Sequence, residues 1–568
     1  MRRTKRPANP DSNDSPLKQK QMISSRRDFL KGFGAATIAS AVPMAALGAH
    51  AQNGNGAKQA LDLNITNRRN EAFHRRLQAA KVDAKFPVPA HPGNGDESLF
   101  PNGLGNFTKG FKHDNFGEVD PAAYSAYLAA CRSGKSADFD SLVLGGTVPL
   151  VDPQAGLAFD LESIDVSQTA IPPVPTLASP ERAAEAIEVY WMALTRDVPF
   201  SQYGSDPTAQ AAAAELSANH AFNGPRASNG NVTGATLFRG FAPGDLAGPF
   251  ISQLLIQRFN YGAMPFSGYL TDLPLNQGGA DYMTSTTTWL KVQNGQAPFE
   301  PEHPDGSLRF TRSGRDLAAY VHIDAAYEAY LNAALILTKI GAHLNSGNPY
   351  SSLKSETGFI TFGMPMVQVL VAEVASRALK NAWYQKWFVH RAIRPEEYGG
   401  LVHFTKTGDK SYPLDPSILN SQAVQATFHR NGSYLLPMSF PEGCPQHPSY
   451  PQGHATLAGA SATILKWFFD ENFIIPNPVV ATDDGSGLIA YTGPDAGNLT
   501  VGGEINKLAS NIGIGRDMAG VHWRLDYQQG LLLGEAIAIS VLRDQKNLYN
   551  ENFTGFTFTK FDGNKITI

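Results

Sequence analysis

The sequence predicts a mainly α protein whose second half is a helix bundle with a functional site in its core. Apolar residues recur every three or four positions over several long stretches after residue 310, which is the periodicity of buried helices. The alternation of β-branched residues that is typical of strands is almost absent. The chain has 568 residues, enough for a large core or two subdomains.

Residues 1–51 have the features of a targeting signal rather than of a folded element. Arg26 and Arg27 are followed by Asp-Phe-Leu-Lys, by an alanine-rich apolar stretch and then by the small-x-small cleavage pattern Ala-His-Ala. A twin arginine in this setting indicates the twin-arginine export pathway. We therefore expect a bacterial protein that is exported and is periplasmic or secreted.

The charge balance argues against nucleic acid as a general partner. The chain has 47 Lys and Arg residues and 51 Asp and Glu residues, of which the predicted signal contains nine and three. The remaining 38 basic and 48 acidic residues give residues 52–568 a net charge of about −10. The two cysteines, Cys131 and Cys444, exclude a thiolate metal site or a disulfide framework, although one bond between them is allowed.

Residues 52–310 form the predicted N-terminal half, which combines helices with many loops. Up to residue 180 it is rich in Gly, Pro and Asn and has few periodic runs, so we expect it to wrap a core built later in the chain. The helices predicted in this half are Pro121–Cys131, Pro180–Thr195, Asp206–Ala221 and Pro249–Phe259.

Residues 311–568 form the predicted C-terminal helical bundle, which carries the site. Asp324 lies among apolar residues of its first helix and is either a surface carboxylate or the orienting partner of a buried cation. The helices of the bundle are expected at residues 316–344, 365–390, 455–469, 505–516 and 523–543.

The loop from Cys444 to His454 is the stretch around which the bundle is organised. It carries His447 and His454, and its three prolines disfavour helix in the residues before them. The loop should therefore stay extended until Gly453, where a helical apolar run begins. A glycine amide and a histidine then lie at the positive end of a helix, which is a ready anion site.

Two further stretches bring cations to this point. Lys386 lies near the end of a predicted helix and Arg394 just beyond it, before a proline that should stop the helix; regular helix would place them roughly 80° apart. Arg516 and His522 would lie roughly 120° apart on an unbroken helix. Gly520 can break the helix between them, so that both side chains face one pocket.

Lys386, Arg394, Arg516 and the Gly453 amide, with two histidines, make an oxyanion cage suited to phosphate or a phosphate-like metal oxyanion. One histidine can bond to the central atom while the other moves protons near neutral pH. Each of these side chains alone is more often a surface charge or a structural residue. Their order and spacing together are far more specific.

This pattern resembles the superfamily of vanadium-dependent haloperoxidases and type 2 acid phosphatases, and its bromoperoxidase branch in particular. Three motifs carry the resemblance in order: Lys-x7-Arg-Pro from Lys386, Pro-x-Gly-His ending at His454, and Arg-x5-His from Arg516. The decapeptide that starts at His447 is similar to that branch throughout, and weaker likeness covers most of residues 180–545. The resemblance implies a mainly α fold with one or two four-helix bundles.

The resemblance also implies a role for each site residue. His522 would bond vanadium directly, and His454 would be the acid–base partner of the apical oxygen. Asp324 would pair with Arg516, and Lys386 would also polarise peroxide. His447 replaces an aromatic residue of the chloroperoxidases, which favours bromide or iodide. The equatorial oxygens would be held by Lys386, Arg394, Arg516 and the Gly453 amide.

Gln452 departs from the family pattern, which usually has serine at this position. The serine hydroxyl donates to an oxyanion oxygen. A glutamine amide can donate too, but it is longer and bulkier. This position therefore bears on vanadate affinity and on halide preference.

The predicted activity is that of a vanadate-dependent bromoperoxidase, which uses hydrogen peroxide to oxidise bromide or iodide to hypohalous acid that halogenates small organic substrates. Two alternatives use the same cage: a type 2 acid phosphatase with a phosphohistidine at His522, and a non-enzymatic oxyanion-binding protein. The family implies a homodimer or a larger assembly. Asp483 and Asp484 belong either to a structural calcium site or to an ordinary polar turn.

Overall fold

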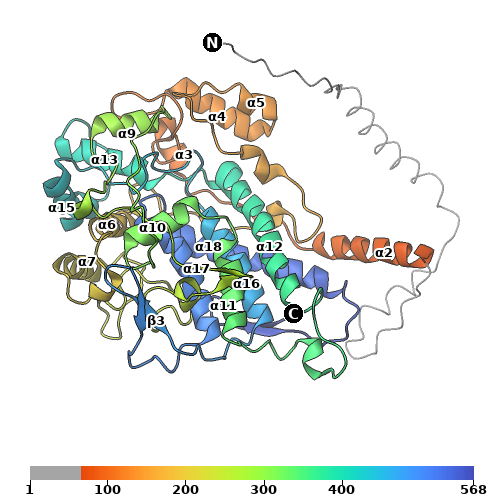
Figure 1. Ribbon diagram of the computed structural model, residues 1–568. Coiled ribbons are helices and arrows are strands. Elements are labelled where there is room, and N and C mark those ends of the chain that lie inside the picture. The colour runs from red at the N-terminus through yellow and green to blue at the C-terminus, as the bar shows by residue number, and fades with distance from the viewer. Residues whose placement is uncertain (1–64) are drawn as a thin grey trace, which may run out of the picture. The chain divides into compact units, whose positions relative to one another are not determined.

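The computed structural model describes residues 65–568, so the predicted export signal lies outside the described residues. The described chain is mainly α, as predicted, with short two-stranded antiparallel sheets (Figure 1). Its α-helices are α2 (Ile65–Asp83), α3 (Asp96–Leu99), α4 (Pro121–Ser133), α5 (Ser136–Asp140), α6 (Pro180–Leu194), α7 (Pro207–Ala218), α8 (Gln253–Ile256), α9 (Thr286–Gln293), α10 (Gly314–Ile323), α11 (Glu328–Lys339), α12 (Met364–Tyr384), α13 (Pro395–Thr407), α14 (Pro416–Leu419), α15 (Gln422–Asn431), α16 (Gly453–Phe468), α17 (Val501–Met518) and α18 (Arg524–Lys546). A π-helix, η8 (Gln385–His390), continues α12.

The strands pair in sequence order. Each pair is a local antiparallel hairpin. The pairs are β1 (Asn260–Tyr261) with β2 (Met264–Pro265), β3 (Val479–Ala481) with β4 (Leu488–Ala490), and β5 (Thr557–Thr559) with β6 (Lys565–Thr567).

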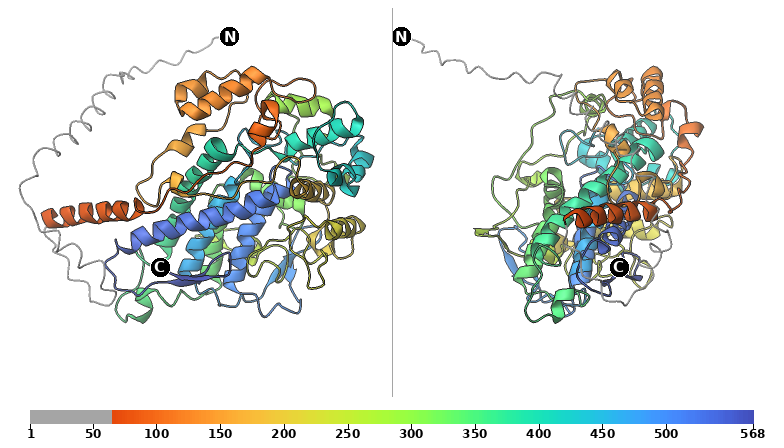
Figure 2. Two further views of the ribbon diagram at one scale, coloured as in Figure 1. Left: turned by 180° about the vertical axis from the view of Figure 1, so that it is seen from behind. Right: turned by 90° about the vertical axis from the view of Figure 1, so that its right-hand side faces the viewer.

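Helix α16 is the centre of the bundle. All of its residues except His454 are buried, and it packs against α12, α17 and α18 (Figures 1 and 2). Glycine on α18 lets the two backbones approach closely, since a Cβ atom at Gly534 would lie 1.9 Å from the carbonyl oxygen of Thr456. This contact fixes the N-terminus of α16 against the helix that follows His522.

The single helix predicted for residues 316–344 is wrong, because the chain is broken between α10 and α11. Asp324 has extended backbone, with φ −66° and ψ 147°. No proline or glycine marks the break, so periodicity alone cannot reveal it. Tertiary contacts hold it instead: the Ala325 amide donates to Glu328 Oε2 at 3.1 Å, and the Asp324 carboxylate pairs with His454.

Most other predicted helices are present close to their predicted ends, including α4, α6, α7, α16, α17 and α18. The helix predicted for Pro249–Phe259 is largely wrong, since only Gln253–Ile256 is helical. The sequence analysis missed α2, α9, α13 and α15. Helix α13 was missed because Pro395, expected to stop a helix, is the first residue of one, where its missing N–H costs nothing.

The segment around Phe107, part of the N-terminal region, packs against η8 and the residues that follow it. The Phe107 amide donates to the carbonyl oxygen of Arg391 at 2.9 Å, and Asn106 forms an isolated bridge with Ala392. The Phe107 ring meets Trp387 of η8 edge-on, with ring centroids 5.9 Å apart. The expectation that this region wraps a later core is confirmed at this point.

The main hydrophobic core takes residues from Leu177 to Ile568 and so draws on both predicted halves. The boundary at residue 310 between those halves stays a prediction. Within residues 65–568, no helix is long and apolar enough to cross a membrane.

Candidate functional site

The candidate site lies where three predicted segments meet at the N-terminus of α16. These segments are η8 with the start of α13, the loop before α16, and the junction of α17 with α18. Lys386, Arg394 and Arg516 are exposed by only 0%, 0% and 6% there. The three cations that the sequence assigned to the cage are therefore buried together in the bundle.

The loop before α16 ends where the sequence predicted. Gln452 is the N-cap residue and Gly453 the first residue of the helix. The Gln452 amide donates to the carbonyl oxygen of Asp526 at 3.0 Å, which ties the start of α16 to α18. A Cβ atom at Gly453 would lie 3.0 Å from the Trp383 ring, so glycine allows the tight packing that leaves the helix amide at the cage.

The π-helix directs Lys386 at the loop. Lys386 Nζ donates to the carbonyl oxygens of Pro448 at 2.8 Å and Ser449 at 2.6 Å. An extra residue in a helical turn rotates the side chains that follow it, and π-helical turns are frequent at functional sites. Arg391 then adopts left-handed backbone, with φ 42°, and ends the turn.

Arg394 reaches the same loop from the N-cap position of α13. Its Nε and Nη2 donate to the carbonyl oxygen of His447 at 3.0 and 2.9 Å, and its Nη1 donates to that of Val521 at 2.7 Å. The prediction that Lys386 and Arg394 converge is confirmed. Both cations donate hydrogen bonds to backbone carbonyls of the segments that carry His447 and His522.

Arg516 completes the set from the last turn of α17. Its Nη1 donates to the carbonyl oxygen of Val321 at 2.8 Å, and its Nε is buried without a partner among the described residues. Gly520, with φ 83°, lies between α17 and α18 as predicted. No direct hydrogen bond joins Arg516 to Asp324 among the described residues, because the Asp324 carboxylate is 3.0 Å from His454 Nε2; its charge still acts on Arg516, whose pKa it raises.

His522 is held with one nitrogen facing the cage. Its Nδ1 donates to Asp526 Oδ2 at 2.8 Å, and its Nε2 accepts from Arg394 Nη1 at 2.9 Å. The Ser449 hydroxyl also donates to Asp526 Oδ2. The sequence analysis gave no role to Asp526 or Ser449, although the four-residue spacing of His522 and Asp526 on one helical face was a usable signal.

The other two histidines differ in their exposure. His447 is 7% exposed, its Nδ1 accepts from Arg394 Nη2 at 2.9 Å, and its ring centroid lies 4.8 Å from that of Trp383. The His454 side chain is 28% exposed and pairs with Asp324, whose side chain is 5% exposed. His454 is therefore the cage histidine with a path to solvent.

Burial of several cations in one place perturbs their ionisation. Burial, and then the charge of Arg394, lowers the pKa of Lys386 well below its usual value and that of Arg516 to about 10. Burial and the neighbouring cations also lower the pKa of His522 and His447 well below 6.5, so both rings are neutral at neutral pH. Such a cluster gains stability when an anion enters it.

The residues fit a tetrahedral metal oxyanion such as vanadate. Arg516 Nε has no partner among the described residues, the α16 N-terminus offers an amide, and two further cations converge there. The Nε2 lone pair of His522 is directed into the same space because Nδ1 carries the proton. Donors for the oxygens and one nitrogen for the central atom are thus present.

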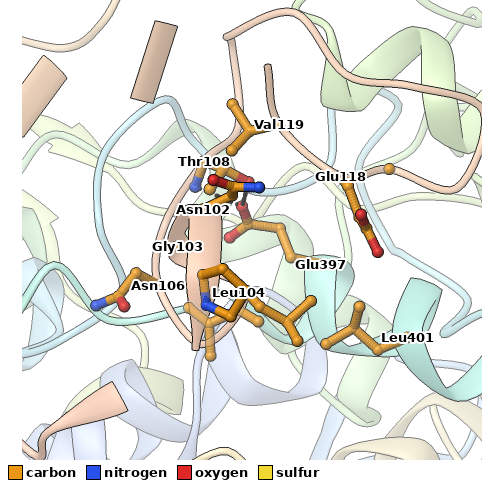
Figure 3. Close-up of a pocket in the computed structure, with 12 residues that line it drawn as sticks. Asn102, Gly103, Leu104, Asn106, Thr108, Glu118, Val119, Glu397 and Leu401 are labelled. Atoms are coloured by element: carbon orange, nitrogen blue, oxygen red, sulfur yellow. Dashed lines mark hydrogen bonds between the residues drawn. The ribbon is translucent and has the colours of Figure 1, made fainter. Parts of the chain in front are cut away.

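A cavity of about 80 Å³ is lined by Ile393, Glu397 and the segment around Thr108 rather than by cage residues, and Figure 3 shows the Glu397 carboxylate directed at Thr108. Glu397 Oε1 accepts from the Thr108 amide at 2.7 Å, and Oε2 accepts from the Arg394 amide at 2.9 Å. Glu397 therefore ties the N-terminal segment to the residue that bears a cage cation.

The suggested calcium site finds no support in the structure. Asp484 accepts from Ser486 and from Thr482, and Asp483 accepts from Ser201 and Gln202, as in a polar turn. Among the described residues, no group of three or more His, Cys, Asp or Glu side chains is placed to hold a metal ion. Calcium at this turn stays a prediction.

The two cysteines are free and buried. Cys131 packs in the aromatic cluster with Trp387, whereas Cys444 Sγ lies 3.7 Å from the carbonyl oxygen of Val521. The disulfide that the sequence allowed does not form in the structure.

Comparisons with known proteins show which family this chain resembles. The family model described as the VCPO second helical-bundle domain matches residues 368–551. The vanadium-dependent bromoperoxidase of Ascophyllum nodosum is 38% identical over 529 residues, which cover 88% of this chain and 92% of that protein. The vanadium-dependent bromoperoxidase of Corallina pilulifera is 36% identical over 600 residues, which cover 89% of this chain and 99% of that protein.

A solved structure shows the same fold over most of the chain. It is the homohexameric structure of the second vanadate-dependent bromoperoxidase of Ascophyllum nodosum, with a TM-score of 0.84 and 33% sequence identity. The match covers 91% of this chain and 93% of that chain. The likeness therefore extends well beyond the three motifs at the cage.

Proposed function

The chain belongs to the vanadium-dependent bromoperoxidase family, and from that premise we propose how its own residues perform the reaction. The enzyme uses hydrogen peroxide to oxidise bromide to hypohalous acid, which then halogenates organic substrates. Bound vanadate supplies a Lewis acid that activates peroxide without a change in oxidation state. The observation that carries the proposal is the burial of three cations around His522, whose Nε2 is turned inward.

The cations and one amide hold the oxyanion. Lys386, Arg394 and Arg516 now donate to backbone carbonyls and would donate to the oxygens of a bound anion, which are stronger acceptors. The Gly453 amide adds the positive end of the α16 dipole. His522 Nε2 would be the ligand to the metal, since Asp526 accepts from Nδ1 and so keeps the proton of the ring on that nitrogen.

His454 is the group that moves protons. It follows Gly453 directly, it is the partly exposed histidine of the cage, and Asp324 Oδ1 accepts from its Nε2 at 3.0 Å. A carboxylate at this distance fixes the orientation of the ring and stabilises its protonated form. His454 can therefore take a proton from peroxide as it binds and return one to the leaving oxygen.

His447 and Trp383 form the side of the site that we assign to the halide. The neutral imidazole lies against the indole ring, and Lys386 Nζ is 5.8 Å from the centroid of that ring. The Lys386 ammonium group, held over the indole face, supplies the positive charge that would attract a halide to this side. We propose bromide and iodide as the substrates accepted here.

Bromination of a β-diketone reporter by the metal-free protein, titrated with orthovanadate in the presence of peroxide and bromide, tests the function. Activity should appear with vanadate, should be suppressed by phosphate and should be lost in His522→Ala. Hydrolysis of a phosphate ester is measured on the same preparation. Ester hydrolysis without bromination would assign the cage to a phosphatase, and vanadate binding with neither activity would assign it to an oxyanion-binding protein.

We also propose export by the twin-arginine pathway, supported by Arg26 and Arg27 and by the cleavage pattern that ends at Ala51. Full-length protein expressed with and without Arg26→Lys and Arg27→Lys should be found in the periplasm only when the arginines are intact. Cytoplasmic retention of both forms would contradict the proposal.

We propose that the enzyme works as a homo-oligomer, a dimer or a larger assembly. The hexameric state of the solved relative supports this proposal. Light scattering after size-exclusion chromatography should give a mass at least twice that of one chain. One full-length chain, with the predicted signal included, has a mass of 61.2 kDa. A monomer at micromolar concentration would contradict it.

A further inference from the structure

The side chain of Gln452 has an unusual hydrogen-bonding state. It is fully buried, its Nε2 donates to the carbonyl oxygen of Gly513 at 3.0 Å, and its Oε1 has no partner among the described residues. The carboxamide cannot rotate by 180° to exchange its oxygen and nitrogen, because Oε1 would then face the carbonyl oxygen of Gly513, which is also an acceptor. Gln452 therefore presents an acceptor, whereas the donor expected from the sequence is already in use.

The position of this acceptor follows from the helices on either side. Gln452 precedes Gly453, whose amide is a cage donor, and its side chain crosses to α17. Gly513 lies about one turn before Arg516, and helix carbonyls point toward the C-terminal end of their helix. The side chain of Gln452 thus joins the residue before the Gly453 amide to the helical turn that precedes Arg516.

We propose that Gln452 makes the cage selective for oxyanions that carry a proton, by accepting a hydrogen bond from their hydroxyl group. Vanadate and phosphate retain a hydroxyl near neutral pH, whereas sulfate has none. A protonated anion can donate a hydrogen bond to the buried Oε1. An anion without a proton brings one of its own oxygens close to Oε1, and neither of these two acceptors can then donate. The inference rests on the proposed function and adds how the site chooses its anion.

The cations cannot provide this selection. Lys386, Arg394 and Arg516 donate to any oxyanion of suitable size, and so does the Gly453 amide. At pH 8 hydrogen phosphate and sulfate are both dianions of similar size. A difference in their affinity at that pH therefore reports the hydroxyl group rather than the charge.

Calorimetric titration of the metal-free protein with phosphate and with sulfate at pH 8, without peroxide or halide, tests the proposal. Phosphate should bind at least about tenfold more tightly than sulfate, the effect of one hydrogen bond to a charged group. Gln452→Leu removes the acceptor and should reduce the ratio of the two affinities by about tenfold. Equal binding of both anions by the wild type, or an unchanged ratio in the variant, would overturn the proposal.

Gln446→Leu is the matched control. Gln446 is also a buried glutamine of the same loop with an unpartnered Oε1, but its carboxamide faces Gly110 and Gly295. It lies outside the cage, so its replacement should leave the ratio of phosphate to sulfate affinity unchanged. A ratio that falls equally in both variants would mean that loop packing, not the Gln452 acceptor, sets the selectivity.

If the Gln452→Leu variant does not fold, Gln452→Ser provides a second test of the proposal. A hydroxyl can donate as well as accept, so sulfate should gain affinity relative to phosphate. If sulfate does not gain, the acceptor role of Gln452 is wrong. A wild type that binds neither anion would contradict the cage itself and with it the proposed function, whereas equal binding contradicts the selection alone.

Discussion

At the scale of single residues, the site depends on which partner each charged group meets. The sequence predicted that the three cations and the histidines converge, and the structure brings them together, because their spacing and their prolines and glycines are local features. It did not identify Asp526 as the partner of His522, and it paired Asp324 with Arg516 instead of His454. Such pairings depend on how the end of α10 meets α16, which no local pattern encodes.

Asp526→Asn should weaken vanadate binding by about tenfold or more, the usual cost of removing a carboxylate that orients a metal-bound histidine. The amide no longer fixes the proton on Nδ1 of His522, so Nε2 is less available as a ligand. Equilibrium dialysis with vanadate measures the change.

Asp517→Asn is the control for this prediction. Asp517 is equally buried, neither of its oxygens has a partner among the described residues, and burial raises its pKa well above 3.8. A protonated carboxyl resembles an amide, so vanadate affinity should change by less than about threefold. Equal losses in both variants would show a general effect of buried charge rather than orientation of His522.

Asp324→Asn separates the observed pairing from the one that the sequence suggested. With Asp324 acting on His454, kcat for bromination should fall by about tenfold or more while vanadate affinity stays nearly constant. If Asp324 acted through Arg516, vanadate affinity would fall together with kcat. Steady-state kinetics and vanadate dialysis on the same variant distinguish the two.

At the scale of elements, long periodic helices were predicted well and their interruptions were not. Helix α16 begins at the expected glycine, but the break between α10 and α11 and the π-helical turn of η8 were not foreseen. Both irregularities place site residues: the first frees Asp324 for His454, and the second directs Lys386 at the loop. Local periodicity cannot report a distortion that tertiary contacts stabilise.

Gly534→Ala should destabilise the protein by about 1–3 kcal/mol, since a methyl group would lie 1.9 Å from the carbonyl oxygen of Thr456 and force α16 and α18 apart. Chemical denaturation measures the free energy of unfolding. Gly497→Ala is the control, because nothing lies within 4 Å of a Cβ atom there. Similar stability of the two variants would refute the close packing of α16 on α18.

The end of α2 should respond to pH. Burial and then the nearby Asp544 carboxylate raise the pKa of Asp83 from 3.8 to about 6. The folded chain binds this proton more tightly than the unfolded chain does, so the stabilisation is present at low pH and is lost as the pH rises through about 6.

Asp83→Asn, which is uncharged at every pH, should therefore raise Tm at pH 7.5, and its advantage over the wild type should shrink at pH 5. Thermal unfolding of both proteins at the two pH values measures this. A constant difference in Tm would show that Asp83 does not share a proton with Asp544.

At the scale of the whole molecule, the N-terminal region forms a small hydrophobic cluster of its own, which packs on Trp387 and supports the site. The sequence left the role of residues 52–180 unassigned, because their contacts are long-range and their own periodicity is weak. In the structure Phe107 bonds to the backbone at Arg391, and Thr108 bonds to Glu397, which also holds the Arg394 amide. The family resemblance, by contrast, could be predicted from the sequence, because the cage motifs that carry it are local.

The central claim is that vanadate binds in this cage with His522 as its nitrogen ligand. X-ray absorption at the vanadium K edge, on vanadate-loaded wild type and His522→Ala, tests it most directly. We predict one nitrogen ligand and a shell of oxygens in the wild type, with the nitrogen lost in the variant. An all-oxygen shell in the wild type, or the same spectrum from both proteins, would contradict the claim.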